Sequence, residues 1–149
     1  MLKIEKKSLE KNNGVFFHQG NAEKLKFQNN YFDKYIISFC LRNITNIEKS
    51  FEEAYRVLKP GGSYFCLEFS KPKSDYVNKL YNTYKKNILP FLGELVAKNK
   101  NAYNYLNESI DLFPNQKKLK SMMKKNGFNN VSYINLFDGI VTIHKGYKL

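Results

Sequence analysis

Two short apolar runs with a helical pattern between them give the clearest structural signal in the chain. Residues 35–40 and 63–69 are rich in aromatic and aliphatic side chains, which favours two buried strands. Between them, one helical face carries Ile47, Phe51, Ala54, Tyr55 and Leu58. The spacing Thr45-x-x-Glu48 predicts a capping box at the start of this helix, and Pro-Gly-Gly at 60–62 predicts its end. Strand, helix and strand together predict a right-handed βαβ unit in a parallel sheet.

Polar residues follow each predicted strand. Arg42 and Asn43 come directly after the first strand, and Ser70 and Lys71 come directly after the second. Parallel sheets bind ligands at the carboxyl ends of their strands, so we expect a site at these two turns.

Upstream, the signals are weaker. Residues 1–12 have helical spacing, and the Asn-Gly pair at 13–14 would end that helix. Residues 15–18 (Val-Phe-Phe-His) favour a short strand, with the Gly-Asn-Ala turn at 20–22 after it. Such a turn needs no ligand, and from the residues alone a ligand-free turn is the preferred interpretation.

Downstream of Pro72 the pattern is helical. A stripe of Tyr76, Leu80, Tyr84 and Ile88 predicts one helix, and further helices are expected near 92–96, over 101–111 and after Pro114. The last of them has Leu119, Met122 and Met123 as its apolar face and Gly127 as its stop. Core packing is the expected role for most of these tyrosines and methionines.

The final segment predicts an antiparallel pair. Strands over 131–137 and 140–144 would be joined at Asp138-Gly139, a strong hairpin signal. The only histidines, His18 and His144, fall in predicted strands and are expected to be strand residues. Cys40 and Cys66 likewise fall in strands and are expected to be reduced core thiols; no metal site is expected.

Composition adds a strong positive charge. The 149 residues carry a net charge of +12, but only Arg42 and Arg56 are arginines and the lysines are scattered among acids and asparagines. We rank compositional drift first, contact with an anionic membrane surface second, and nucleic-acid binding a distant third. No apolar run of about 18 residues is present, and the polar start predicts a cytoplasmic location, with peripheral contact at the inner membrane face as an option.

Several motifs then point to one family. FD-x4-SF-x-LRN (32–43), YRVLKPGG (55–62) and LEFSKP (67–72) resemble the ubiquinone/menaquinone-biosynthesis C-methyltransferases, which are class I enzymes dependent on S-adenosylmethionine. LKPGG alone occurs widely in class I methyltransferases, whereas SF-x-LRN with LEFSKP is more specific. Further matching motifs lie at 20–27, 89–90, 103–110, 126–128 and 144–147. The resemblance therefore covers nearly the whole chain.

The resemblance implies a fold, a reaction and a site. The fold would be an α/β class I methyltransferase (Rossmann-like) sheet, with a helical insertion over 72–115 covering the substrate and a C-terminal antiparallel hairpin. The reaction would be C-methylation of a prenylated quinol, either demethylmenaquinol or 2-methoxy-6-polyprenyl-1,4-benzoquinol. The implied cofactor-binding residues are Asn21, Ala22 and Ser38, and the implied substrate-binding residues are Asn43, Tyr103 and Tyr105.

Arg42 is the implied catalytic residue. Its always-charged guanidinium could hold a phenolate or orient a water that takes the hydroxyl proton. The alternative is a structural arginine paired with Glu68 or Asp33, because an arginine directly after a buried strand needs a partner.

One family feature is missing from the sequence. None of the eight glycines forms the G-x-G loop that cradles the methionine end of the cofactor, and no upstream strand ends in the acid that binds the ribose. The resemblance therefore predicts an incomplete sheet that lacks the first nucleotide-binding βαβ unit. We expect 1–149 to be a single partial domain. The preferred explanation is a fragment of a longer enzyme, for example one half of a split gene. The alternatives are a decayed gene product and a non-catalytic, lysine-rich binding module.

Overall fold

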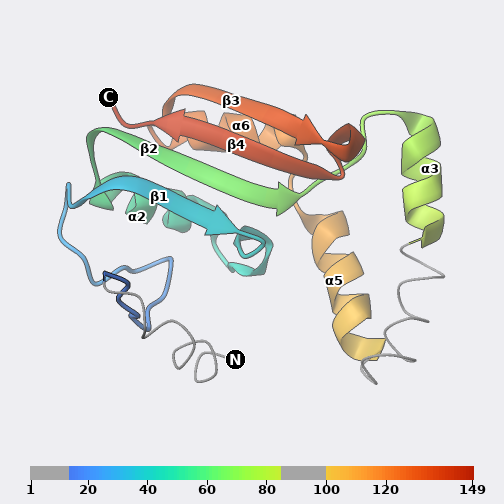
Figure 1. The fold of residues 1–149 in the computed structure, drawn as a ribbon, viewed down its shortest axis with the longest axis horizontal. Helices are drawn as coiled ribbons and strands as arrows, with labels where there is room; N and C mark the ends of the chain where they lie inside the picture. The colour runs from blue at the N-terminus through green and yellow to red at the C-terminus, as the bar shows by residue number, and fades with distance from the viewer. Residues whose placement is uncertain (1–13, 85–99) are drawn as a thin grey trace.

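The computed structural model describes residues 14–84 and 100–149, with only the backbone for residues 100–103. Four strands form one mixed sheet in the order β1-β2-β4-β3 (Figure 1). β1 (Phe32–Ser38) is parallel to β2 (Leu58–Phe69). β4 (Val141–Tyr147) is antiparallel to both β2 and β3 (Asn129–Leu136). The parallel pair and the C-terminal antiparallel pair are confirmed.

Two helices cover one face of this sheet, and two others lie beyond its end. α2 (Ile47–Val57) and α6 (Gln116–Lys125) lie behind the strands in Figure 1. α3 (Asp75–Thr83) and α5 (Lys100–Leu112) lie beyond the end to which the β2 arrow points. The parallel strands therefore direct their carboxyl ends towards α3 and α5.

The core lies between the sheet and the two covering helices. The ring of Tyr64 on β2 lies at its centre, 5.6 Å from Phe51 of α2, 5.4 Å from Tyr35 of β1 and 5.1 Å from Phe128, measured between ring centroids. The apolar face predicted for α2 is confirmed through Phe51 and Ala54, which are fully buried. The apolar face of α6 is also confirmed through Leu119 and Met123.

The predicted end of α2 at 60–62 is wrong: α2 ends at Val57, and β2 begins at Leu58 instead of Ser63, so Pro-Gly-Gly lies inside the strand. Pro60 disfavours helical backbone at the residue before it, so the chain is already extended there.

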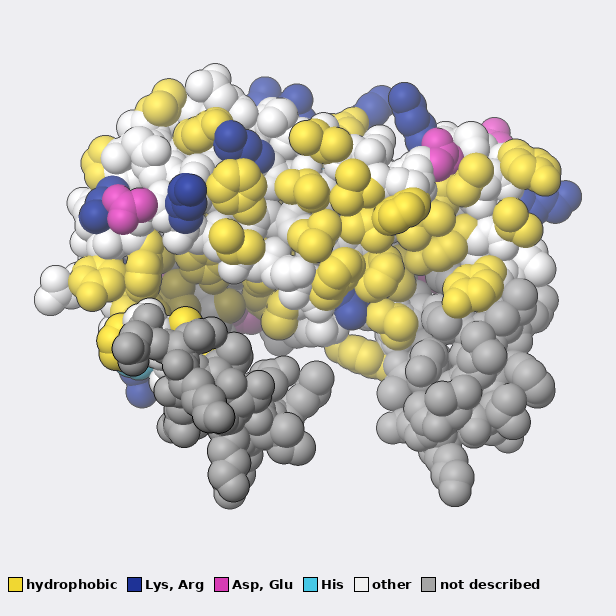
Figure 2. Space-filling view, viewed as in Figure 1, with side chains coloured by type: hydrophobic (Ala, Val, Ile, Leu, Met, Phe, Trp, Pro, Cys, Tyr) yellow, Lys and Arg dark blue, Asp and Glu magenta, His cyan; other side chains and the backbone are white. Residues whose placement is uncertain are grey.

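The opposite face of the sheet is apolar and carries no helix among the described residues. Along β2, Tyr64, Cys66 and Glu68 are buried towards the helices, whereas the alternate side chains are only partly buried. Figure 2 shows hydrophobic side chains gathered over this face. Ile36 on β1 is 70% exposed and Ile134 on β3 is 63% exposed. Parallel strands are normally covered on both faces, so the exposed face is unusual for this architecture.

The expected strand at 15–18 is wrong. Residues 15–20 are irregular, and Val15 and Phe16 are exposed. A strand needs a neighbour for its backbone N–H and C=O groups, and no described strand lies beside this segment. His18 is therefore not a strand residue, whereas His144 lies in β4 as expected.

The capping box at Thr45 is also wrong, by one residue. Asn46 is the N-cap of α2, because its side chain accepts a hydrogen bond from the Lys49 N–H at 3.0 Å. Its own N–H donates to Glu23 Oε1 at 2.9 Å, so Glu23 has the role that Glu48 was expected to have towards the N-cap residue. Glu48 instead pairs with Lys125 at 3.2 Å.

Two further expectations about burial need correction. β1 ends at Ser38, so Cys40 lies outside the strand and is exposed; only Cys66 is a core thiol. The helix with the aromatic stripe exists as α3, but Tyr76, Leu80 and Tyr84 are exposed instead of packed in the core. Ile88 and the helices expected at 1–12 and 92–96 lie outside the described residues.

The helix expected over 101–111 is confirmed as α5. Asp138 and Gly139 have positive φ, 56° and 98°, in the short 3-10 turn η3 (Phe137–Gly139) that joins β3 to β4, so this turn is also confirmed. Within residues 14–84 and 100–149, no helix has the length and apolar character needed to cross a bilayer.

Candidate functional site

The carboxyl ends of β1 and β2 bring Arg42 and Glu68 together. Arg42 lies in the 3-10 turn η1 (Leu41–Asn43) that follows β1, and its Nη1 donates to Glu68 Oε1 at 2.7 Å. Glu68 is only 1% exposed. Its carboxylate also accepts the backbone N–H of Phe69 at 2.9 Å and of Arg42 at 3.3 Å. A buried carboxylate needs such partners, so this pair is part of the folded core.

The guanidinium of Arg42 is held on three sides. Nη1 also donates to the Phe39 carbonyl at 2.8 Å, and Cζ lies 5.4 Å from the centroid of the Phe69 ring. The Nε atom is buried without a hydrogen-bond partner in the described part of the chain. Of the two structural partners expected for Arg42, Glu68 is the one observed; Asp33 instead accepts from Lys59 at 2.8 Å.

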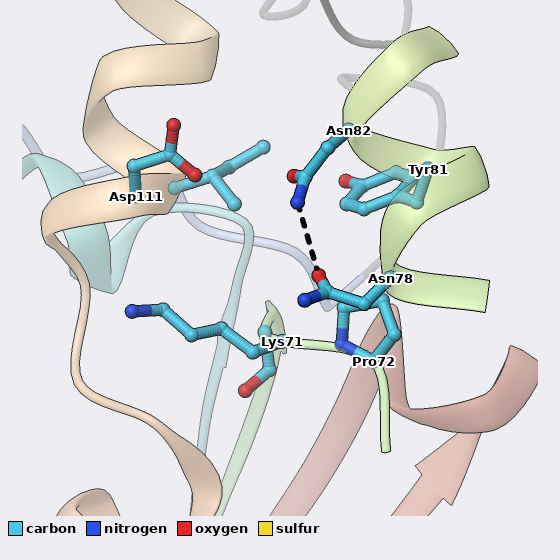
Figure 3. A pocket seen from close by; sticks show the side chains of 8 residues that line it. Lys71, Pro72, Asn78, Tyr81, Asn82 and Asp111 are labelled. Atoms are coloured by element: carbon cyan, nitrogen blue, oxygen red, sulfur yellow. Dashed lines mark hydrogen bonds between the residues drawn. The ribbon is translucent and has the colours of Figure 1, made fainter. Parts of the chain in front are cut away.

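A polar cavity of about 240 Å³ lies at the end of β2 (Figure 3). It is lined by Ser70, Lys71, Pro72, Asn78, Tyr81, Asn82, Ile110 and Asp111. The Ser70 hydroxyl is buried and lacks a hydrogen-bond partner among the described residues. Asn82 Nδ2 donates to Asn78 Oδ1 at 3.3 Å. In Figure 3, Asp111 of α5 lies across the cavity from these two side chains of α3, and Lys71 extends from the end of β2. An oxygen-bearing ligand in this cavity could therefore meet a hydroxyl, amide or charged group.

The surroundings of Tyr81 in this cavity change the pKa of its phenol. Its burial raises the pKa of the phenol above its ordinary value of 10.0, the charge of Asp111 raises it further, and the positive charge of Arg42 acts in the opposite direction. Tyr81 therefore stays protonated at neutral pH and can donate or accept a hydrogen bond.

A second cavity, of about 210 Å³, has Arg42 in its wall together with Tyr105 of α5. The Tyr105 hydroxyl donates to Asn43 Oδ1 at 3.1 Å. Two of the expected substrate-binding residues, Asn43 and Tyr105, are thus brought together next to Arg42. The side chain of Tyr103 lies outside the described part of the chain.

The turn at 20–22 borders a third cavity, of about 310 Å³. Ala22, Leu25 and Phe27 supply apolar lining, and His18, Gln19, Gly20 and Lys26 complete it. Asn21 Oδ1 accepts the backbone N–H of Glu23 at 2.9 Å, so this oxygen is used within its own turn. Ser38 is exposed at the last position of β1.

Comparison with known proteins decides the family. The sequence model of the ubiE/COQ5 methyltransferase family matches residues 1–148. The chain belongs to the ubiE/COQ5 methyltransferase family. Among curated relatives, it is 52% identical over 134 residues to the ubiquinone/menaquinone biosynthesis C-methyltransferase UbiE of Vibrio vulnificus, covering 90% of this chain and 52% of that protein. It is 46% identical over 136 residues to the mitochondrial 2-methoxy-6-polyprenyl-1,4-benzoquinol methylase of Xenopus laevis, covering 91% of this chain and 44% of that protein.

The chain spans about half the length of these relatives. Solved structures agree on the fold. A SAM-dependent methyltransferase from Thermotoga maritima matches with a TM-score of 0.65 at 21% identity, over 91% of this chain and 65% of that one. Phosphoethanolamine N-methyltransferase 2 of Haemonchus contortus matches with a TM-score of 0.64 at 15% identity, over 97% of this chain and 40% of that one. The described residues of this chain therefore form an incomplete, Rossmann-like methyltransferase sheet.

The residues present fit one end of S-adenosylmethionine, the cofactor of this family. Ala22, Leu25 and Phe27 give the third cavity an apolar wall suited to a flat aromatic base, and Gln19 adds amide groups for its ring nitrogens. The fit is limited to the adenine end, since the sequence contains no G-x-G loop for the methionine end.

Tyr81, Asn82 and Asp111 were missed as site residues by sequence reasoning. Asn78 and Asn82 share one helical face at i and i+4, and this pairing was the available local signal. Asp111 lies at the end of α5, so its approach to Tyr81 depends on how two helices pack.

Proposed function

We propose that this chain carries the substrate-facing part of an enzyme that C-methylates a prenylated quinol, using S-adenosylmethionine as methyl donor. The substrate would be demethylmenaquinol or 2-methoxy-6-polyprenyl-1,4-benzoquinol. Family membership and the names of the curated relatives support the reaction class. The observation that carries the proposal is Arg42, a cation fixed by Glu68 at the carboxyl end of β1, whose Nε and Nη2 atoms donate no hydrogen bond within the described residues.

S-adenosylmethionine, when bound, supplies a methyl group on a sulfonium that is a good leaving group. The chain must then make a ring carbon of the quinol nucleophilic and hold it in line. A water oriented by Arg42 would take the proton of a ring hydroxyl, and negative charge would then lie on the oxygen and, by resonance, on the ring carbon. After that carbon has received the methyl group, it would release its own proton to solvent and the ring would regain its aromaticity. Arg42 would hold that phenolate oxygen, and Glu68 would keep the guanidinium from turning away. Asn43 and Tyr105, already hydrogen-bonded together, would border the ring.

The cofactor-binding part of the proposal rests on the turn at 20–22 and on Ser38. Ala22 would contact the adenine, and Ser38 would lie near the cofactor at the end of β1. The amide nitrogen of Asn21, which donates no hydrogen bond within the described residues, would donate to the adenine. A polypeptide segment with a G-x-G loop, joined to this chain or separate from it, would bind the methionine end. The uncovered apolar face of the sheet and the unpaired outer edge of β1 among the described residues support such a segment. Without it we expect weak binding of the cofactor.

We propose a cytoplasmic location with peripheral contact at the inner membrane face. The net charge of +12 would favour anionic headgroups where a lipid-tailed substrate resides. The same charge favours the second candidate function, a non-catalytic basic binding module. The two are separated by whether a quinol is methylated or an anionic polymer is bound with steep salt dependence.

Complementation in a bacterium whose own UbiE is deleted tests the proposal. The strain would express this chain, the N-terminal half of the Vibrio vulnificus relative, or both, and the extracted quinones would be identified by mass spectrometry. Methylated quinone is expected with both pieces and not with the N-terminal half alone. Continued accumulation of the demethylated quinone in the presence of both, with both proteins detectable, would count against the function.

A further inference from the structure

An apolar groove of about 510 Å³ lies between α3 and the start of β4. It is lined by Val77, Leu80, Tyr81, Thr83, Tyr84 and Ile140. Leu80 is 63% exposed although it lies in this lining. An aliphatic side chain left in water at the wall of a groove lacks the apolar contact that would normally cover it.

The groove is held in shape by a fixed joint between α3 and η3. Ser74, the N-cap of α3, donates to Asp138 Oδ2 from its backbone N–H at 3.0 Å and from its hydroxyl at 2.9 Å. The N–H of Lys73 also donates to the Asp138 carbonyl at 2.7 Å. These bonds fix the start of α3 against the turn that leads to Ile140. The two walls of the groove are therefore set by the fold instead of by a flexible side chain.

The groove and the polar cavity at the end of β2 have Tyr81 in common. Tyr81 lines both: the polar cavity with Ser70, Lys71 and Asp111, and the apolar groove with Leu80 and Tyr84. Two adjoining cavities of opposite character, sharing one tyrosine, suit a ligand with a polar ring and an apolar tail. The volume of the groove lies in the range of about 300–1,000 Å³ that is typical of small-molecule sites.

We propose that this groove holds the first isoprenoid units of the quinol tail, with the ring in the direction of the polar cavity. This rests on the proposed function for the identity of the ligand. Val77 and Tyr84 are seven residues apart on a helical backbone, so the lining extends roughly 10 Å along the axis, about the length of two isoprenoid units. Affinity should therefore rise with tail length up to about two units and then level off.

Calorimetric titration of the full chain with hydroquinone, geranylhydroquinone and farnesylhydroquinone tests this. We expect a gain of at least about tenfold in affinity from hydroquinone to geranylhydroquinone, since apolar surface of both partners leaves water. Leu80→Ser should remove most of that gain. Ile134→Ser is the matched control, because Ile134 is also 63% exposed but lies on β3 and lines no cavity described above. Tyr84→Ser, at the other end of the groove, should also reduce the gain in affinity with tail length. This second variant shows whether the effect of Leu80→Ser comes from the groove or only from a local change at Leu80.

Three results would overturn the proposal. The first is a failure of the binding test: either the affinity does not depend on tail length, or Leu80→Ser and Ile134→Ser change the affinity equally. The second is that Leu80→Ser abolishes flotation with anionic phosphatidylglycerol vesicles and leaves tail binding unchanged, which would assign the groove to a bilayer. The third is that Leu80→Ser removes a concentration-dependent dimer in sedimentation and leaves tail binding unchanged.

Methyl transfer in the complementation strain separates this inference from the function. If the quinone is methylated and Leu80→Ser does not alter the preference for tail length, the groove proposal fails and the proposed function stands. If binding depends on tail length but no methylation occurs, the proposed function fails and the groove proposal stands.

Discussion

Replacing Arg42 by leucine should destabilise the fold through Glu68. The substitution leaves a carboxylate that is only 1% exposed with two backbone N–H donors, from Phe69 at 2.9 Å and from residue 42 at 3.3 Å. Removing one partner of a buried ion pair costs about 3–5 kcal/mol, and the two remaining donors favour the lower end, about 3 kcal/mol. Replacing both members, as Arg42→Leu with Glu68→Met, removes the stranded charge. That double variant should lie within about 1 kcal/mol of the unmodified chain.

Guanidinium chloride unfolding followed by circular dichroism measures these free energies, and an unchanged denaturant slope would confirm that the variants unfold from the same compact state. A loss below about 1 kcal/mol for Arg42→Leu would mean that the pair behaves like a surface ion pair. A double variant as unstable as the single one would mean that packing around the guanidinium, not charge, is the dominant contribution. Either result would refute the reasoning from burial.

The same double variant separates the structural role of Arg42 from its proposed catalytic role. In the complete enzyme it should fold normally yet turn over about 10²–10³-fold more slowly, the scale for losing one donor to a developing oxyanion. Turnover that returns together with stability would make Arg42 a structural residue only.

Other predictions concern stability, titration and the cofactor. Asn46→Ala should cost about 1 kcal/mol of unfolding free energy, measured by the same denaturation, because α2 loses its N-cap. Burial raises the pKa of the Cys66 thiol to about 12, so iodoacetamide should label Cys40 in the native chain and Cys66 only after unfolding, as read by mass spectrometry. Burial lowers the pKa of His144 below 6.5, so the unfolded state takes up the proton first. Unfolding free energy should therefore be fully present above pH 6.5 and fall as pH drops through the lowered pKa, a slope that His144→Gln should reduce. Asn21→Ala should weaken cofactor affinity more than turnover in the complete enzyme, measured by calorimetry and kinetics.

Local pattern was sufficient for the elements that bury one face. The strand–helix–strand unit and α6 were predictable because apolar spacing follows the face that packs, as in Phe51 and Ala54 of α2. The segment at 15–18 has the composition of a strand, but a strand also needs a neighbour, and composition does not report one. Asn46 and Thr45 are both able to cap a helix, so capping preference alone does not distinguish two start positions that are one residue apart.

The site was predictable where it follows the sheet. Arg42 and Glu68 meet because the carboxyl ends of two parallel neighbours lie at one edge, so their pairing was one of two expected outcomes. Tyr81 and Asp111 come from helices whose positions depend on tertiary packing. The exposure of Leu80 could not be predicted either, because helical spacing alone does not indicate whether other residues cover an apolar stripe.

Transfer of the methyl group itself tests the central claim most directly. This chain, co-purified with the N-terminal half of the Vibrio vulnificus relative, would be given S-adenosylmethionine with a labelled methyl group and a demethylated prenyl quinol. We expect label on a ring carbon of the quinol with the unmodified chain, and less label with the double variant Arg42→Leu, Glu68→Met. A folded complex that binds both molecules and leaves the ring carbon unlabelled would contradict the central claim.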